Sequence, residues 1–419
     1  MTYYSKETMA FENIECLKPT TCKSCQADGC GVYGECEQCL RNRAWNKEYI
    51  ETHLFKCDEY FRNYHAGGKH DTFKQTVFRM PGEKPYLYYG IEIEVKFDEE
   101  YLKVFYTDDD GYEDENQTSD DCEQMLKEFT EATNGMFIYE RDGSLYNGVE
   151  FISRPTSYAR WIDKDTIAKL EAGIEVLKKW GAYNEQPDTN GMHVHISRKF
   201  FDYGEQDGEK RRKMYQDMDW LFQYYQSELE KIADRKYTQY CQSKMAKIKN
   251  EYGIGMQNNR DSRWNVELEI KGKMKKGGSM AEGDHYSAVS ISGRTIEGRI
   301  FKSTIDVAHI IGNIEVMRNF SHVVRNEEIV GKTLNDILHT KDNMYLDQVL
   351  DETRKKWFKK NATYKKELKE INKKLRDNKA KGNETQVKFL ESDKNIWKND
   401  VKESEFNLNR VAKDEMEIK

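Results

Sequence analysis

The feature that most constrains the fold is an alternation of apolar and acidic side chains near residue 90. Residues 89–95 read YGIEIEV. In a β-strand, successive side chains point to opposite faces, so the isoleucines and the valine share one face while Glu92 and Glu94 share the other. Two neighbouring carboxylates repel each other unless a cation or water separates them. Taken alone, an ordinary half-buried strand with a solvated face explains this pattern better than a site does.

Three further segments show the same alternation of apolar and functional side chains. Residues 191–196, GMHVHI, place His193 and His195 opposite an apolar face. Residues 294–300, RTIEGRI, place Glu297 and Arg299 together on one face, and a turn at 142–144 leads into GVEFIS, which carries Glu150. If these strands lie in one antiparallel sheet, their polar faces converge on a single concave surface. The joint pattern favours a functional site over a solvated sheet.

The residue types of this surface indicate its chemistry. Several carboxylates with one or two imidazoles suit Mg²⁺ or Mn²⁺ rather than zinc. An arginine beside such metals suits a phosphate group or a phosphorylated intermediate. The sequence has no G-x-x-x-x-G-K-[ST] motif and no recognisable nucleophilic triad. The basic, glycine-containing segment 271–278 is interpreted as a surface loop, with closure over phosphates as the alternative.

Composition excludes some classes of partner. Net charge is −7, from 67 basic and 74 acidic side chains, so no overall basic field indicates nucleic acid, and local basic runs read as solvated helix faces. No apolar stretch approaches the roughly 20 residues that span a bilayer. The N-terminal residues lack the pattern of a signal peptide. We therefore expect a cytoplasmic protein without a membrane or nucleic-acid partner.

Seven of the nine cysteines lie before residue 60. Two C-x-x-C pairs, Cys22 with Cys25 and Cys36 with Cys39, predict a tetrahedral structural zinc site. An iron–sulfur cluster and buried reduced thiols are the less favoured alternatives. Such a module would recruit a protein or nucleic-acid partner, or stiffen the N-terminal region. Further candidate ligands, enough for a second ion, are Cys16, Cys30, Cys57, His53, His65 and His70.

Helical periodicity surrounds the strands. It predicts a helix capped by Asp165 and ended by Gly181, a second over 214–232 and a third over 307–324, all laid on one face of a sheet. The acidic insertion 98–121 lacks the spacing of a calcium loop and is interpreted as a solvated loop or edge hairpin. Heptad-like positions on either side of Gly382 predict a helical hairpin, docked on the protein or paired in a dimer.

These patterns predict an α+β protein whose curved antiparallel sheet carries helices on its outer face. The expected division is a Cys-rich zinc module over 1–80, a catalytic domain over 81–332 and a charged helical region over 333–419.

The order of the motifs resembles that of the carboxylate–amine ligase superfamily, which includes glutamine synthetase and glutamate–cysteine ligase. Over roughly 86–330 it is similar to the predicted amidoligase family, common in bacteriophage and bacterial genomes. The shared motifs are GIEIE at 90–94, DGS at 142–144, GVE at 148–150, GMHVH at 191–195 and IEGRIF at 296–301. An A-x-S strand at 288–290 and a Tyr240–Cys241 pair also match. Each motif is weak singly, but four in order are specific.

The resemblance implies roles for the matching residues. Glu92, His193 and Glu297 would hold the metal that bridges the nucleotide phosphates, and Glu94 and Glu150 would hold a metal nearer the acceptor carboxylate. It also implies that Asp142 contributes a further acidic ligand and that Arg299 stabilises the transferred phosphoryl group. His195 would face the substrate or the second metal shell, and Arg294 would contact phosphate.

The implied activity is an ATP- and Mg²⁺- or Mn²⁺-dependent ligase with a glutamine synthetase-like sheet. It would join a carboxylate to an amine through an acyl phosphate, on small molecules, peptides or proteins. The alternatives are a non-catalytic scaffold that docks partners through its zinc module or C-terminal helices, and a phosphoryl transferase like the guanido kinases. Intact acidic and histidine positions favour catalysis, and the histidine strand favours the ligase.

Overall fold

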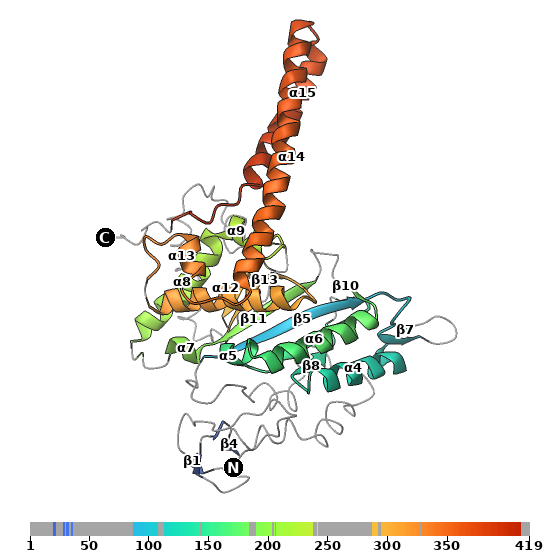
Figure 1. Ribbon diagram of the computed structural model, residues 1–419, viewed down its shortest axis with the longest axis vertical. Helices are drawn as coiled ribbons and strands as arrows, with labels where there is room; N and C mark the ends of the chain where they lie inside the picture. The colour runs from blue at the N-terminus through green and yellow to red at the C-terminus, as the bar shows by residue number, and fades with distance from the viewer. Residues whose placement is uncertain are drawn as a thin grey trace, which may run out of the picture.

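A computed structural model of the protein is shown in Figure 1. Four two-residue strands, β1 (Thr20–Thr21), β2 (Asp28–Gly29), β3 (Gly31–Val32) and β4 (Glu35–Cys36), are described near the N-terminus. Beyond them, the structure describes residues 87–107, 113–142, 145–183, 190–202, 205, 207–237, 241, 287–291, 295–326 and 328–411.

A curved, open antiparallel sheet forms the centre of the described region. Its strand order is β12-β13-β11-β5-β9-β8, and β10 pairs with the end of β5. This arrangement agrees with the mixed α and β class and the antiparallel sheet expected from the sequence. The strands are β5 (Tyr89–Phe97), β8 (Phe137–Glu140), β9 (Gly148–Ser153), β10 (Ala182–Tyr183), β11 (Gly191–Ser197), β12 (Val289–Ile291) and β13 (Thr295–Lys302).

Strand β5 lies in the middle of the sheet and sets the register of the polar side chains. Glu92 is opposite His193 on β11, and Glu94 is opposite Glu150 on β9. A β-bulge interrupts the pairing of β11 with β13 between Met192 and Val194. Bulges bend a strand and redirect its side chains, and they are common beside functional sites.

Helices cover one face of the sheet, where they pack on the apolar side chains of the strands (Figure 1). Ile91 and Val95 of β5 share one continuous core with Leu170 and Ile310 of two of these helices. The helices are α4 (Asp120–Ala132), α5 (Tyr158–Trp161), α6 (Lys164–Lys179), α7 (Lys199–Asp202), α8 (Gly208–Tyr224), α9 (Gln226–Ile232) and α12 (Val307–Arg325).

The ends of two helices differ from the sequence prediction. The cap of α6 is Asp163, whose carboxylate accepts from the backbone N–H groups of Asp165 and Thr166, so the prediction of Asp165 as cap was wrong. Asp165 lies in the first turn, where its charge is favourable near the helix N-terminus. The single helix expected over 214–232 is divided at Tyr225 into α8 and α9.

The acidic insertion contains a two-stranded antiparallel hairpin outside the main sheet, formed by β6 (Phe105–Thr107) and β7 (Glu113–Thr118). This agrees with the edge hairpin that was one expectation for the insertion. No helix in the described part of the chain is both long and apolar enough to cross a membrane.

After α13 (Leu334–Leu338), the chain forms α14 (Leu346–Ala380) and α15 (Glu384–Glu403), which project from the sheet and its helices (Figure 1). The two long helices pack side by side through Ile371, Leu375 and Leu390. Gly382, with φ of +69°, lies in the turn between them, and such left-handed backbone favours glycine.

Candidate active site on the polar face of the sheet

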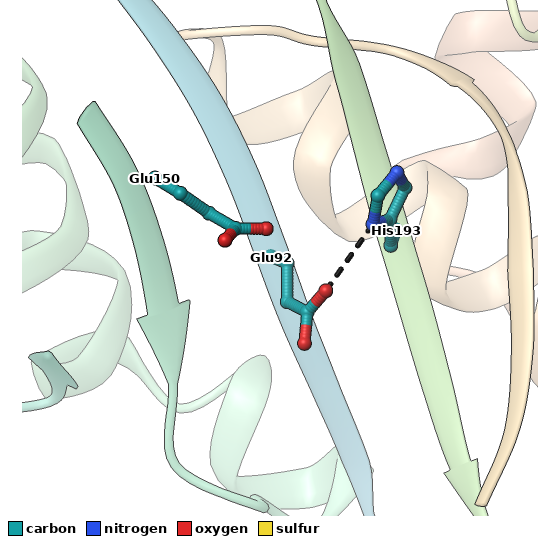
Figure 2. Close-up of side chains that lie close together, drawn as sticks. All are labelled: Glu92, Glu150 and His193. Carbon is teal, nitrogen blue, oxygen red and sulfur yellow. Dashed lines mark hydrogen bonds and ion pairs between the residues drawn. The ribbon is translucent and has the colours of Figure 1, made fainter. Parts of the chain in front are cut away.

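The face of the sheet opposite the helices carries the polar side chains that the alternation singled out. Three neighbouring strands bring Glu150, Glu92 and His193 together, each from a different strand (Figure 2). Glu94 and Glu297 are also buried beside them, at 6% and 8% exposure. The convergence follows from strand order, because β9, β5, β11 and β13 are adjacent in the sheet.

His193 is the centre of this group. Its Nδ1 lies 3.2 Å from Oε2 of Glu92 and 3.3 Å from Oε1 of Glu297, and its Nε2 lies 3.6 Å from Oε1 of Glu94. The ring is 3% exposed. One imidazole therefore contacts carboxylates from both strands that flank β11.

His195 and Arg299 are further members of the group, His195 two residues along β11 and Arg299 on the neighbouring strand β13. Nε2 of His195 lies 3.2 Å from Oε1 of Glu92, and its Nδ1 lies 3.3 Å from the hydroxyl oxygen of Thr295. The guanidinium of Arg299 donates to Oε1 of Glu297. Arg299 lies in the bulge itself, because residues 299 and 300 of β13 are opposite the single residue His193 of β11, so the bulge affects where its side chain points.

One backbone donor and one side-chain donor hold Glu94 in a fixed position. The N–H of Gly191 donates to Oε2 of Glu94, and the hydroxyl of Ser303 donates to the carbonyl of the same residue. Burial raises the pKa of Glu94, although His193 and the Gly191 N–H act in the opposite direction. The sequence gives no periodic signal for the Ser303 contact, since it arises from a residue beyond the end of β13.

Two carboxylates near the middle of the face, Glu92 and Glu150, differ in their proton affinity. Burial alone would raise the pKa of Glu92, but the charges of His195 and His193 and their hydrogen bonds lower it well below its ordinary value. The pKa of Glu150 is raised well above its ordinary value by burial and by the negative charges of Glu92 and Glu94. A cation bound among them would offset this repulsion and favour the ionised form of each.

The arrangement fits a divalent metal ion. Glu92, Glu150 and His193 form one group whose ligand atoms lie within 4.8 Å of one another, and Glu92, His195 and Glu297 form a second. Both carboxylate oxygens of Glu150 are buried and accept no hydrogen bond from any residue that the structure describes. Buried carboxylate oxygens normally have partners, so this pair is suited to metal coordination. Oxygen-rich groups with an imidazole suit Mg²⁺ or Mn²⁺.

Two buried residues beside the site were missed by the sequence analysis. Glu140 is 1% exposed and opposite Glu150 in the pairing of β8 with β9. The sequence hint for Glu140 is weak: it ends the four-residue strand Phe137–Glu140, which comes just before the turn at 142–144. Arg235 donates to the carbonyls of Arg299 and Phe301 and lies beneath Gly191, but no local pattern indicates that position.

Some of the candidate residues cannot be placed in this group. Asp142 lies just after β8, near enough to raise the pKa of Glu150. Arg294, Tyr240 and the loop 271–278 lie outside the described residues, whereas Cys241 is buried. The side chains of all seven N-terminal cysteines, and those of His53, His65 and His70, also lie outside the described residues.

The fold and the donor set together define a sheet-borne site of carboxylates and imidazoles suited to a divalent cation. The family model described as "Putative amidoligase enzyme" matches residues 95–321, more than half of the chain. The chain belongs to this amidoligase family, which is a family of ligases that form carbon–nitrogen bonds. The match includes Glu150, His193, His195, Glu297 and Arg299, and it begins directly after Glu94. No curated protein matches the chain.

Proposed function

We propose that the protein is an ATP- and Mg²⁺- or Mn²⁺-dependent carboxylate–amine ligase that forms an amide or isopeptide bond through an acyl phosphate. The observation that carries the proposal is the convergence of two ligand groups that share Glu92 on one face of the sheet. Membership of the amidoligase family supports the ligase class. The arginine at the edge of the acidic group supports phosphoryl transfer as the means of activation.

The proposed roles are those that the resemblance to carboxylate–amine ligases implies, and individual contacts of the side chains support them. Glu92, His193 and Glu297 hold the cation that binds the nucleotide phosphates, which matches their contacts through Nδ1 of His193. Glu94 and Glu150 hold a cation nearer the acceptor carboxylate, and their opposed positions on β5 and β9 support this pairing. The proposal adds a weaker acidic contribution from Asp142 and a phosphate contact from Arg294.

The chemistry requires the carboxylate to be activated, because a carboxylate is a poor acyl donor. Bound divalent cations neutralise charge on the migrating phosphoryl group and on the phosphates of ATP. Arg299 stabilises negative charge on the same phosphoryl group, and its contact with Glu297 fixes the direction of its guanidinium. His195 faces the substrate and orients the acceptor. The amine then attacks the acyl carbon, loses a proton and releases inorganic phosphate.

The ligase reaction is tested by incubating the protein with ATP, Mg²⁺ or Mn²⁺ and pooled amino acids, polyamines and peptides, with intact-mass detection of products. The expected product is lighter by one water than the sum of its two precursors, and it forms together with ADP and phosphate. Hydroxylamine as the amine would trap the acyl phosphate as a hydroxamate. A product that retains phosphorus would instead indicate phosphoryl transfer of the guanido-kinase type.

Glu92→Gln and Glu297→Gln test the site itself. Each removes one charged ligand from the group around His193, so we expect ADP release and product formation to fall by at least about a hundredfold. Glu128→Gln is the control, because Glu128 is a surface carboxylate that pairs with Lys179 on α6. Unchanged turnover in the two site variants would show that the residues are assigned wrongly.

We also propose that residues 1–80 form a zinc module joined to the catalytic domain 81–332, with 333–419 as a separate helical region. The two C-x-x-C pairs, Cys22 with Cys25 and Cys36 with Cys39, support the zinc site. Elemental analysis of protein purified without chelator should find at least one zinc per chain. Absence of zinc from such protein would contradict the module.

A further inference from the structure

The long helix α14 is strongly basic in a chain that is acidic overall. Residues 354–381 contain 13 Lys or Arg and 3 Asp or Glu, a formal charge of +10, whereas the whole chain has −7. The net charge of the chain therefore conceals a segregation of charge. The expectation that nucleic acid is not a partner rested on that average and on the interpretation of local basic runs as solvated helix faces, and the charge of this helix bears on both grounds.

Five of these basic side chains lie on the side of α14 that faces away from α15. Helix α15 contacts α14 through Asn361, which donates to the carbonyl of Val401, and through Tyr364, whose ring lies 5.6 Å from that of Trp397. With 3.6 residues per turn, the opposite side of α14 carries a line of exposed lysines. This basic row consists of Lys355, Lys359, Lys366, Lys369 and Lys373.

The lysines of the basic row have no acidic partners among the residues that the structure describes. Other cations of the same helix do pair: Lys356 contacts Asp234 and Lys379 contacts Glu391. Lysines spaced three, four and seven residues apart on one helix repel each other. The row therefore carries uncompensated positive charge that an anionic partner would neutralise.

The basic row is presented on a helix that is anchored at its base. The carboxylate of Glu315 accepts from the backbone N–H groups of Met344, Tyr345 and Leu346, which fixes the start of α14. The chain that follows α15 returns to the body of the protein, where the guanidinium of Arg410 lies 4.2 Å from the ring of Tyr224. Both ends of the helix pair are therefore held, while the pair itself projects (Figure 1).

The dimensions and chemistry of the row favour a nucleic-acid duplex over other polyanions. At 1.5 Å per residue, the row is about 27 Å long, close to the roughly 34 Å of one duplex turn. Helices that bind membrane surfaces need an apolar face beside the charges. Between these lysines only Phe358 is a large apolar residue with high exposure, at 77%. Lys373 is also about 25 Å along the helix from Lys356, several Debye lengths from the acidic body.

We propose that the basic row of α14 docks on the phosphate backbone of a nucleic-acid duplex. The contact is electrostatic and independent of base sequence, because lysines bind phosphates as point charges. It holds the duplex beside the enzyme without using the polar face of the sheet. The proposal is independent of the ligase reaction.

The test measures binding of the full-length protein to a fluorescein-labelled 30-base-pair DNA duplex by anisotropy, from 50 to 200 mM KCl. The variant K359Q/K366Q/K373Q removes three charges from the row, and K388Q/K398Q/K402Q removes three exposed charges from α15 as the matched control. Because each neutralised phosphate contributes about 0.9 to the salt slope, the row variant should lower that slope by about 2 to 3. Its affinity at 100 mM salt should fall by at least about tenfold.

The control variant should keep the wild-type affinity and salt slope, and circular dichroism should give equal helicity for all three proteins. The proposal is overturned by absence of duplex binding, by an unchanged slope in the row variant or by equal losses in the row and control variants. Vesicles with 30% phosphatidylserine and polyglutamate serve as competing polyanions. Binding of either one, without binding of the duplex, also overturns the proposal.

Discussion

Replacing Glu150 with glutamine tests whether the polar face is built to hold a cation. Glu150 and Glu315 are both 0% exposed, so they form a matched pair of buried carboxylates. The oxygens of Glu150 accept no hydrogen bond from any described residue, whereas Glu315 accepts from three backbone N–H groups and from the hydroxyl of Tyr158. The same chemical change should therefore affect the free energy of unfolding very differently at the two positions.

In metal-free protein, Glu150→Gln should change the free energy of unfolding by at most about 1 kcal/mol. The reason is that burial and the neighbouring carboxylates Glu92 and Glu94 raise the pKa of Glu150, so its negative charge is disfavoured where it lies and replacing it with a neutral amide costs little. Glu315→Gln removes a charge that is hydrogen-bonded at the start of α14, and it should cost about 2 to 4 kcal/mol. Urea unfolding with chelator present measures both values.

Added Mn²⁺ should separate the variants further. At a free concentration 100 times its dissociation constant, the ion stabilises the wild-type protein by about 2.7 kcal/mol. Loss of one ligand that weakens binding about a hundredfold leaves about 0.4 kcal/mol at the same concentration. Glu315→Gln should keep the full stabilisation by Mn²⁺. The reasoning is refuted if Glu150→Gln destabilises the metal-free protein as much as Glu315→Gln does and retains the full effect of Mn²⁺.

Three other variants test a close contact beside the site, a buried histidine of α12 and the packing of α14 against α15. Gly191→Ala places a Cβ 2.4 Å from Nη1 of Arg235. We therefore expect the free energy of unfolding in urea to fall by about 1 to 3 kcal/mol and Mn²⁺ binding to weaken. Unfolding and Mn²⁺ binding like those of the wild-type protein would show that this contact is easily relieved. Burial, with the nearby charges of Lys341 and Arg318, lowers the pKa of His322 to about 3, below its unfolded value of about 6.5. Between these two pH values the unfolded state binds a proton that the folded state does not bind. The free energy of unfolding therefore falls as the pH decreases from 6.5 toward 3. His322→Gln should flatten that pH dependence by about 1.4 kcal/mol per pH unit, and an unchanged slope would contradict the assignment. Leu390→Ala opens a cavity between α14 and α15 and should weaken their packing by about 2 to 4 kcal/mol, seen as faster hydrogen exchange in both helices, whereas Phe389→Ala, at an exposed position, should leave exchange unchanged.

Local sequence patterns were enough to establish which side chains share a face of each strand. Period-two alternation places Glu92 with Glu94 and His193 with His195, because successive side chains of a strand point to opposite sides. Helical periodicity likewise located α6 and α12 to within a few residues. These features depend on neighbours in the chain, so they can be read locally. The exact cap of α6 could not, because Asp163 and Asp165 are both suitable residues two positions apart.

The adjacency of the strands and their register could be learned from the three-dimensional fold alone. The pairing of β5 with β11 and β9 brings His193 and Glu150 to opposite sides of Glu92, and the pairing of β8 with β9 adds Glu140. Arg235 reaches the site from beyond α9, about 40 residues further along the chain than His193. Such contacts join residues far apart in sequence, and their spacing carries no periodic signal. The alternation therefore determines the polar face of each strand, while the order of the strands decides that these faces form one site.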